Sequence, residues 1–427
     1  MADKVLHPTG SLKGAVELPG DKSISHRALI LTAISDGDCR VTGLSAAQDV
    51  ESTMTCLRAL GVKINKAKNG VIVHGVGMNG LQPPKKALNA GNSGTTMRLL
   101  AGVLAAQQFT AKLVGDASLQ KRPMRRIIEP LELMGSRIES DEYKAPLTIH
   151  GGLLRAIDFA SSIASAQVKS CTLLAGLYAR GVTRVTEPYH SRDHTELMLQ
   201  EMGANIRSSA AMTAVVGPTE LHARDINVPA DISAAAFFLV AAALLPNSEL
   251  SMENVGVNLS RTGILDALTS MGVNFQLHDQ ATVNNEPRAR ITVQSSNLGA
   301  TSLGGAMVPR IIDEIPIIAV AATQASGVTT IKDAGELRVK ESDRLTALAE
   351  NLSKMGAKVR EKDDGLVITG PTPLKGAVLD SHGDHRIAMA FSIAALIAEG
   401  ETTIQNAECV DISFPHFYDR LEAIQHD

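Results

Sequence analysis

The sequence has 427 residues, a length that favours two or three domains. Lys and Arg number 41 against 45 Asp and Glu, and the aromatic residues are 8 Phe and 4 Tyr with no Trp. The net charge of −4 argues against a nucleic-acid-binding protein, and the few aromatic residues argue against a base-stacking surface.

The beginning of the chain has neither the basic start nor the apolar core of a signal peptide. The most apolar run, 234–245, is too short to span a bilayer. The cysteines are far apart and form no C-x-x-C pair, which argues against a zinc site or a disulfide framework. They are Cys39, Cys56, Cys171 and Cys409. We expect a cytoplasmic protein with no metal or other cofactor and with no membrane or nucleic-acid partner.

One phrase recurs along the chain about every 70 residues. It is a helical pattern that ends in Met-Gly or Leu-Gly and is followed at once by a strand pattern. Glycine is typical of a helix C-terminus, where the backbone becomes left-handed. The phrase predicts helix–glycine–strand junctions at Gly61, Gly135, Gly203, Gly272 and Gly356.

A second element recurs in step with the first. It is a polar cluster followed by a small-residue helix that is apolar almost all round, which is typical of a helix inside a domain. The clusters begin near Lys22, Asn92, Ser165, Asp231, Asp313 and Asp384. Each unit then reads as strand, polar loop, buried helix, strand, second helix and strands. Six such units account for nearly the whole chain and predict an α/β fold.

The polar clusters lie where the buried helices begin. Free backbone N–H groups and the helix dipole favour anions at these positions. The alternative is that the polar residues only cap their helices. With three units in each domain, the helix N-termini would concentrate positive potential in a cleft between two domains.

Several loops carry side chains suited to phosphate or carboxylate groups. The loop 20–27 combines the ammonium of Lys22, the hydroxyl of Ser23 and the guanidinium of Arg27, and it is not a Walker loop. Other loops of the first half contribute further polar groups of the same kind. These are Asn92 with Gly94, Arg122 before a proline, Ser165 with Gln167 and Lys169, and Arg192 within 191–196.

In the second half, cations and carboxylates are mixed. Asp313 and Glu314 lie between apolar residues, so at least one of them should approach the cleft. The run 338–344 holds five charges and includes Lys340, Glu341 and Arg344. The alternative interpretation of this run is an exposed, salt-bridged helix end without a role in the cleft. Asp384, His385 and Arg386 precede the last buried helix. Carboxylates among cations can stay ionised and act as bases.

These motifs resemble those of the 5-enolpyruvylshikimate-3-phosphate synthases over essentially the full length. The resemblance rests on 19–27 (PGDKSISHR), 91–95 (GNSGT), 121–123 (KRP), 165–167 (SAQ), 338–344 (RVKESDR) and 383–386 (GDHR). The variants at 20–22, 165–169 and 192–196 resemble the class II branch of the family. The resemblance implies transfer of the enolpyruvyl group of phosphoenolpyruvate to the 5-hydroxyl of shikimate 3-phosphate, with release of phosphate.

The resemblance also implies the roles of individual residues. Shikimate 3-phosphate is expected at Lys22, Ser23, Arg27, Ser165, Gln167, Arg192, Asp313 and Lys340. Phosphoenolpyruvate is expected at Lys22, Gly94, Arg122, Gln167, Arg344 and Arg386. Proton transfer is expected from Asp313, Glu341 and Lys22, with Asn92, Asp384 and His385 in support.

The fold that the resemblance implies agrees with the sixfold count. It has two similar domains, each of three βαβαββ repeats with buried helices, forming an inside-out α/β barrel. The expected domains are 21–227 and 1–20 plus 228–427, with the active site in the interdomain cleft. A monomer is expected, and no metal is implied.

Three positions depart from the plant-like members of the family. Ile412 stands where those members carry a lysine near the C-terminus, Leu99 replaces a proline and His194 replaces a tyrosine. One phosphoenolpyruvate contact is therefore either missing or supplied from elsewhere in the chain.

Two other functions are alternatives for such a chain. The sister enzymes that transfer enolpyruvate to UDP-N-acetylglucosamine have an opening Lys-Asn pair and a loop cysteine, but here Ser23 follows Lys22 and the 121–123 loop holds no cysteine. A noncatalytic anion-binding or RNA-processing relative of the same fold would gain nothing from Asp313 and Glu341 in its cleft.

Overall fold

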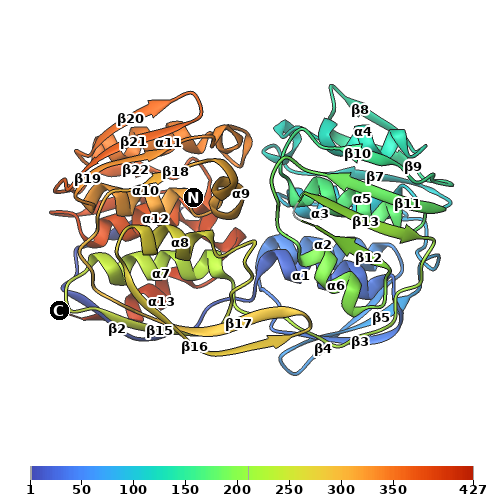
Figure 1. Ribbon diagram of the computed structural model, residues 1–427, viewed down its shortest axis with the longest axis horizontal. Helices are drawn as coiled ribbons and strands as arrows, with labels where there is room; N and C mark the ends of the chain where they lie inside the picture. Colours follow the sequence, from blue (N-terminus) through green and yellow to red (C-terminus); the bar gives the residue numbers. More distant parts are fainter. Residues whose placement is uncertain (1, 210, 427) are drawn as a thin grey trace. The chain divides into compact units, whose positions relative to one another are not determined.

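The computed structural model describes residues 2–209 and 211–426. They form two compact units (Figure 1). The N-terminal unit comprises 20–228, apart from 210, together with Val283–Glu286. The C-terminal unit comprises 2–19, Pro229–Thr282 and 287–426. Each unit has its own apolar core.

Three sheets of the N-terminal unit share one topology. In each, the first two strands are parallel and the next pairings are antiparallel. The first sheet is β14 (Ile226–Asn227), β3 (Asp36–Thr42), β5 (Gly70–Val76) and β4 (Lys63–Ala67). The second is β6 (Leu88–Asn89), β7 (Thr110–Val114), β9 (Lys144–His150) and β8 (Arg137–Asp141). The third is β10 (Asp158–Ala160), β11 (Gly181–Thr186), β13 (Met212–Gly217) and β12 (Ile206–Ser208).

The sheets of the C-terminal unit repeat this plan with small changes. One is β16 (Asn274–Val283), β17 (Glu286–Gln294), β15 (Glu249–Gly256), β2 (Ser11–Val16) and β24 (Gln425–His426). Another is β18 (Ser302–Leu303), β19 (Gly327–Ile331), β21 (Gly365–Gly370) and β20 (Lys358–Lys362). The last is β1 (Lys4–Leu6), β23 (Thr402–Gln405) and β22 (Val378–Asp380).

Two strands complete sheets that are far from them in the sequence. β2 pairs in parallel with β15, so the start of the chain belongs to the sheet of the fourth repeat. β14, which follows the third repeat, pairs in parallel with β3 of the first. Parallel pairing needs a long crossover, and here the crossover is a whole set of repeats. In each unit, a strand from one end of the chain segment thereby completes a sheet of a repeat that is distant in sequence.

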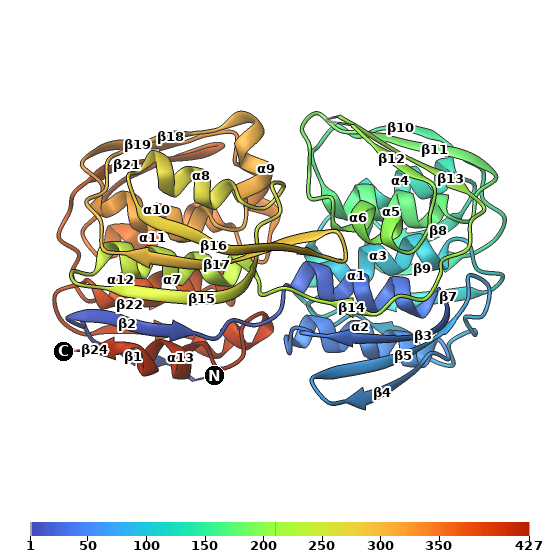
Figure 2. The same cartoon turned by 60° about the horizontal axis from the view of Figure 1, so that its bottom comes forward.

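The helices lie between the sheets of each unit (Figures 1 and 2). One helix of every repeat is almost wholly buried, as the sequence predicts. These helices are α1 (Lys22–Ala33), α3 (Gly94–Leu104), α5 (Ala166–Gly176), α7 (Ile232–Leu244), α10 (Ile315–Gln324) and α12 (His385–Leu396). The second helices are α2 (Gln48–Ala59), α4 (Arg125–Leu133), α6 (His194–Glu201), α8 (Gly263–Ser270), α11 (Arg344–Lys354) and α13 (Phe417–Ala423), and α9 (Val308–Ile311) precedes α10.

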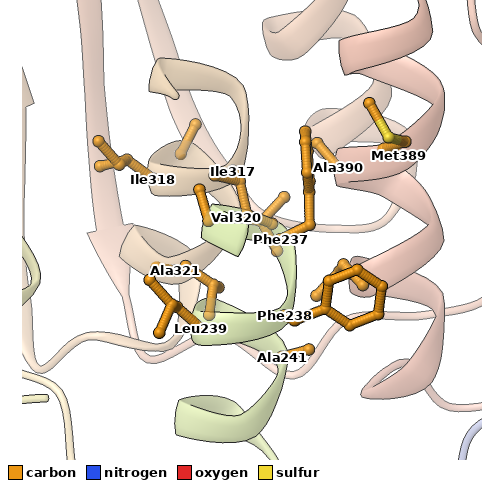
Figure 3. Close-up of a cluster of buried hydrophobic side chains, with 14 of the residues drawn as sticks. Phe237, Phe238, Leu239, Ala241, Ile317, Ile318, Val320, Ala321, Met389 and Ala390 are labelled. Atoms are coloured by element: carbon orange, nitrogen blue, oxygen red, sulfur yellow. The ribbon is translucent and has the colours of Figure 1, made fainter. Parts of the chain in front are cut away.

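Alanine and glycine let the buried helices approach closely. Figure 3 shows Phe237 of α7 beside Ile317 of α10 and Ala390 of α12. In the other unit, a Cβ at Gly102 of α3 would lie 2.2 Å from the Cys171 carbonyl oxygen of α5. Close contact between these central helices therefore requires small residues at such positions.

The five predicted helix-terminating glycines are confirmed. Their φ angles lie in the left-handed region, at +90°, +105°, +90°, +84° and +85°. They belong to Gly61, Gly135, Gly203, Gly272 and Gly356. Glycine adopts this conformation without the steric cost of a Cβ, so it ends each helix and directs the chain into the next strand.

The turn of the β16–β17 hairpin belongs to the N-terminal unit. There, Glu286 Oε1 lies 2.7 Å from Nδ1 of the buried His194. Asn284 donates a hydrogen bond of 2.9 Å to the Asp225 carbonyl oxygen. The local sequence pattern does not indicate that this turn belongs to the N-terminal unit, because the residues it contacts lie far from it along the chain.

The described residues contain no helix that is both long and apolar enough to cross a membrane. Within those same residues, no group of His, Cys, Asp and Glu is arranged to hold a metal ion. The four cysteines are buried free thiols. Burial raises the pKa of Cys56 and of Cys409 to about 12, which keeps both thiols protonated and unreactive at neutral pH.

Candidate active site

The predicted residues of the first half surround the N-terminal ends of the buried helices in the N-terminal unit. α1 begins at Lys22, and the Asp21 side chain caps it by accepting a hydrogen bond from the Ile24 amide at 2.8 Å. Lys22 and Ser23 therefore occupy the first turn. Lys22 Nζ lies 2.9 Å from Asp49 Oδ2 on α2, in a half-buried ion pair.

Arg27 lies one turn further along α1 and is buried, with 3% of its surface exposed. Its Nε donates to Thr195 Oγ1 at 2.7 Å, and its Nη2 donates to Ser170 Oγ at 2.9 Å. Its Nη1 donates to the Ser23 carbonyl oxygen at 2.9 Å. These three hydrogen bonds to hydroxyl and carbonyl oxygens fix the orientation of the guanidinium.

The loop before α3 is built around Gly94. Ser93 caps the helix by accepting from the Thr96 amide at 3.1 Å. Arg122, in extended backbone before Pro123 as expected, donates from Nη2 to Asn92 Oδ1 at 2.6 Å. A Cβ added at Gly94 would lie 3.4 Å from Arg122 Nη1. Glycine therefore avoids a tight contact between a side chain at position 94 and this guanidinium.

The same geometry identifies Arg98, which the sequence analysis did not select. A Cβ at Gly94 would lie 3.0 Å from Arg98 Nη1. Arg98 also donates to Gln167 Oε1, and Gln167 Nε2 donates to Thr95 Oγ1 at 2.8 Å. Its position one helical turn after Gly94 was the available signal, since residues four apart share a helix face.

Ser165 and Arg192 belong to the same region, at the entrances of α5 and α6. The Ser165 amide donates to Glu187 Oε1 at 2.8 Å, and the Ser165 side chain does not cap α5. Arg192 Nη1 donates to Ser23 Oγ at 3.3 Å. Lys169, by contrast, is buried between Glu187 and Glu196. The expectation that its ammonium adds to an anion-binding loop is therefore wrong.

In the C-terminal unit, Arg344 is the centre of the predicted set. It lies at the start of α11 with 1% of its surface exposed. Its guanidinium is 2.7 Å from Asp384, 2.7 Å from Glu341 and 3.4 Å from Asp313. Burial would lower the pKa of Arg344, but Asp384, Glu341 and Asp313 together raise it above its ordinary value. The guanidinium therefore stays charged in its buried position.

Asp313 also contacts Arg386, at the start of α12. Arg386 Nη2 lies 3.5 Å from Asp313 Oδ2, and Nη1 donates to the Asp313 carbonyl oxygen at 3.0 Å. Asp384 caps α12 by accepting from the Arg386 amide at 2.9 Å, and the buried His385 is the first residue of that helix. Glu314, beside Asp313, is buried and accepts a hydrogen bond from Ser233. Asp313 is thus the carboxylate of this pair that lies among the predicted cations.

The run 338–344 fulfils both interpretations. Arg338 pairs with Asp343 and Glu361 at 2.8 Å each on partly exposed side chains, as a salt-bridged helix end does. Glu341 and Arg344 instead join the buried cluster. Lys340 is half-buried between them, and burial lowers its pKa while Asp313 opposes that shift.

The three departures are all accommodated in packed positions. Leu99 is fully buried on α3, and Ile412 packs against the core of the C-terminal unit. The buried ring of His194 pairs with Glu286.

The family comparison agrees with this geometry. The model of the EPSP synthase (3-phosphoshikimate 1-carboxyvinyltransferase) family matches residues 6–421. The chain belongs to the EPSP synthase family. It is 50% identical over 415 residues to the 3-phosphoshikimate 1-carboxyvinyltransferase of Brevibacillus brevis, covering 97% of each chain. It is 48% identical over 427 residues to that of Bacillus thuringiensis, covering 99% of this chain and 100% of the relative.

A solved structure supports the same EPSP synthase fold. The EPSP synthase of Acinetobacter baumannii superimposes with a TM-score of 0.88 at 42% identity, covering 99% of this chain and 98% of that one. The comparisons favour this family over a UDP-N-acetylglucosamine enolpyruvyl transferase and over a noncatalytic relative.

Proposed function

We propose that this chain transfers the enolpyruvyl group of phosphoenolpyruvate to the 5-hydroxyl of shikimate 3-phosphate and releases phosphate. The observation that carries the proposal is that the chain holds two kinds of polar set, one in each unit. One set contains cations such as Arg27, which donates to hydroxyl groups, and the other contains carboxylates around Arg344. Two anionic substrates need the first set, and proton transfer needs the second.

Shikimate 3-phosphate is assigned to residues of both units. In the N-terminal unit, the first turn of α1, the starts of α5 and α6 and the buried guanidinium of Arg27 offer charge-assisted donors for a phosphate. The assigned residues are Lys22, Ser23, Arg27, Ser165, Gln167 and Arg192, with Asp313 and Lys340 of the C-terminal unit.

Phosphoenolpyruvate is assigned to the guanidinium groups and the glycine loop. Gly94 lets a ligand approach the Arg122 guanidinium closely, because no Cβ stands in front of it. The assigned residues are Lys22, Gly94, Arg122, Gln167, Arg344 and Arg386. Asn92 and Asp384 are assigned as supports, since they bind Arg122 and Arg344, and His385 supports the start of α12.

The reaction then divides into addition and elimination. In the addition, the 5-hydroxyl oxygen bonds to C2 of phosphoenolpyruvate, loses its proton to a base, and the methylene carbon gains a proton from an acid. In the elimination, a proton leaves the new methyl group and the C2–O bond to phosphate breaks. Asp313 and Glu341 are assigned to the proton transfers together with Lys22, because these carboxylates lie beside cations that keep them ionised.

The test is phosphate release by the purified protein with shikimate 3-phosphate and phosphoenolpyruvate. UDP-N-acetylglucosamine in place of shikimate 3-phosphate is the matched control. We expect release with the first pair and none with the second. Release only with the UDP-sugar would establish the sister activity, and release with neither acceptor would contradict the proposal.

A further inference from the structure

Lys169, Glu187 and Glu196 form a buried ionic cluster in the N-terminal unit, here termed the Lys169 triad. Their side chains are 1%, 4% and 5% exposed. Lys169 Nζ lies 3.2 Å from Glu187 Oε2 and 2.8 Å from Glu196 Oε1. It also donates to the Ser191 carbonyl oxygen at 3.2 Å. The triad joins α5, the end of β11 and α6.

Such a cluster is a poor source of stability. Burial would lower the pKa of Lys169, but Glu196 and Glu187 raise it, so the ammonium stays charged. Taking charges out of water costs several kcal/mol for each ion, and apolar side chains of similar volume often serve a fold equally well. What the triad does supply is directional bonding, which an apolar core cannot supply.

Glu187 uses that directionality to connect two loops of the proposed substrate site. Its Oε1 accepts from the Ser165 amide at 2.8 Å, and both carboxylate oxygens lie 2.8 Å from Ser191 Oγ. Ser165 precedes α5, and Ser191 directly precedes Arg192. One carboxylate therefore fixes the backbone of Ser165 and the start of the loop that carries Arg192.

The other members of the triad act through their chain neighbours. Ser170 follows Lys169 on α5, and Thr195 precedes Glu196 on α6. Their hydroxyl oxygens lie 2.6 Å apart, and both accept hydrogen bonds from Arg27. The spacing of α5 and α6 set by the triad is therefore also the spacing that seats the Arg27 guanidinium.

We propose that Lys169, Glu187 and Glu196 are positioning residues for shikimate 3-phosphate. They place Ser165, Arg192 and Arg27 without contacting the substrate themselves. This inference rests on the proposed function, because it assigns those three residues to shikimate 3-phosphate. It adds a specific expectation: loss of the triad weakens the binding of shikimate 3-phosphate and leaves the binding of phosphoenolpyruvate largely unaffected.

The first test is Glu187→Gln, which keeps the shape and removes the charge. We expect the KM for shikimate 3-phosphate to rise about tenfold, which corresponds to about 1.4 kcal/mol. The KM for phosphoenolpyruvate should stay within about twofold and kcat within about threefold, since the reacting groups are unchanged. Glu142→Gln is the matched control, because Glu142 pairs with Lys144 on an exposed hairpin of the same unit. It should change neither KM.

A second variant covers the case in which Glu187→Gln does not fold. The triple change Lys169→Met, Glu187→Gln and Glu196→Gln leaves no unpaired buried charge, so we expect it to fold. Titration calorimetry with shikimate 3-phosphate alone should then show binding at least about tenfold weaker than that of the wild type.

The outcomes separate this inference from the proposed function. A wild-type protein that releases no phosphate contradicts the proposed function itself. An active wild type with an unchanged KM for shikimate 3-phosphate in the folded variants overturns the positioning role alone. Equal increases in both KM values, or a loss confined to kcat, overturn it as well, because the role predicts a selective loss.

Discussion

The two sets of site residues place different groups around their cations. In the N-terminal unit, Arg27 and Arg122 bind hydroxyl, amide and carbonyl oxygen atoms. In the C-terminal unit, Arg344 binds three carboxylates, and Arg386 lies beside one of them. Hydroxyl, amide and carbonyl oxygens orient a guanidinium through hydrogen bonds, whereas carboxylate partners also compensate its charge.

This difference indicates a division of labour. The N-terminal set is suited to binding phosphate and carboxylate groups, and the C-terminal set is suited to moving protons. In the first set, the ammonium of Lys22 pairs with the carboxylate of Asp49. Lys22 is the residue of this set that is proposed for both tasks.

The largest effect is expected at Lys22. Lys22→Met should lower kcat about a thousandfold, because a charge that stabilises the transition state is lost as well as a contact with both substrates. Steady-state phosphate release is the measurement, with the exposed Lys144→Met as control. Activity within a few-fold of the wild type would remove Lys22 from the reacting centre.

Asp313→Asn and Glu341→Gln test the proton-transfer half of the comparison. Each should lower kcat by about a hundredfold or more and keep both KM values within a few-fold, since an amide keeps the shape but cannot take the proton. Glu361→Gln, which alters only the partly exposed pair with Arg338, should behave as the wild type does. Normal turnover by either amide variant would show that its carboxylate is not the base.

Stability distinguishes the two kinds of partner directly. Arg344→Gln should lower the free energy of unfolding by about 3 kcal/mol or more, because it leaves the fully buried Asp384 without its cation. For comparison, loss of the Arg122 hydrogen bond to Asn92 in Arg122→Gln should cost about 1 kcal/mol. Urea unfolding of both variants gives the comparison, and equal losses would contradict it.

Gly94→Ala tests the site residues of the N-terminal unit by their effect on an inhibitor. We propose that glyphosate competes with phosphoenolpyruvate and needs shikimate 3-phosphate bound first. The added methyl would meet the guanidinium ends of Arg98 and Arg122 at 3.0 and 3.4 Å. Glyphosate is the longer ligand, so its inhibition constant should rise by one to two orders of magnitude, about 1–3 kcal/mol, and exceed the change in the phosphoenolpyruvate KM. Equal losses for both ligands, or a wild type indifferent to glyphosate, would show that Gly94 does not control access.

The smallest expected effect is a change in the pH dependence of stability caused by His26, a buried residue of α1. Its Nδ1 is 2.7 Å from Thr53 Oγ1, which lies 2.6 Å from Thr96 Oγ1 at the start of α3. Burial lowers its pKa well below 6.5, helped by Lys22 and Arg27 and opposed by Asp21.

The sign of the resulting pH dependence follows from proton binding. Below pH 6.5 the unfolded chain binds a proton at His26 that the folded protein does not, so stability falls as the pH falls. The slope is at most about 1.4 kcal/mol per pH unit. Urea unfolding at pH 7.5 and 5.5 should show a smaller decrease for His26→Gln than for the wild type. An identical decrease would exclude His26 as the source.

Much of the fold could be predicted because its signals are local. A left-handed glycine such as Gly203 ends a helix whatever lies around it, and an Ala-rich helix such as α7 has no polar face to expose. The polar clusters were also visible, since each begins a helix. The sequence did not distinguish helix capping from anion binding at these clusters. In the structure, side chains cap the helices at four of them, whereas the Ser165 side chain does not. The four are Asp21, Ser93, Asp231 and Asp384.

The sequence by itself determined the repeats, the buried helices and the chemical character of each loop. Only the tertiary structure decided which charges meet: it buries Lys169 between two glutamates and divides the run 338–344 between surface and core. It also places β2 beside β15 and β14 beside β3. Backbone conformation depends on near neighbours, whereas the pairing of charges and strands depends on residues brought together from distant parts of the chain.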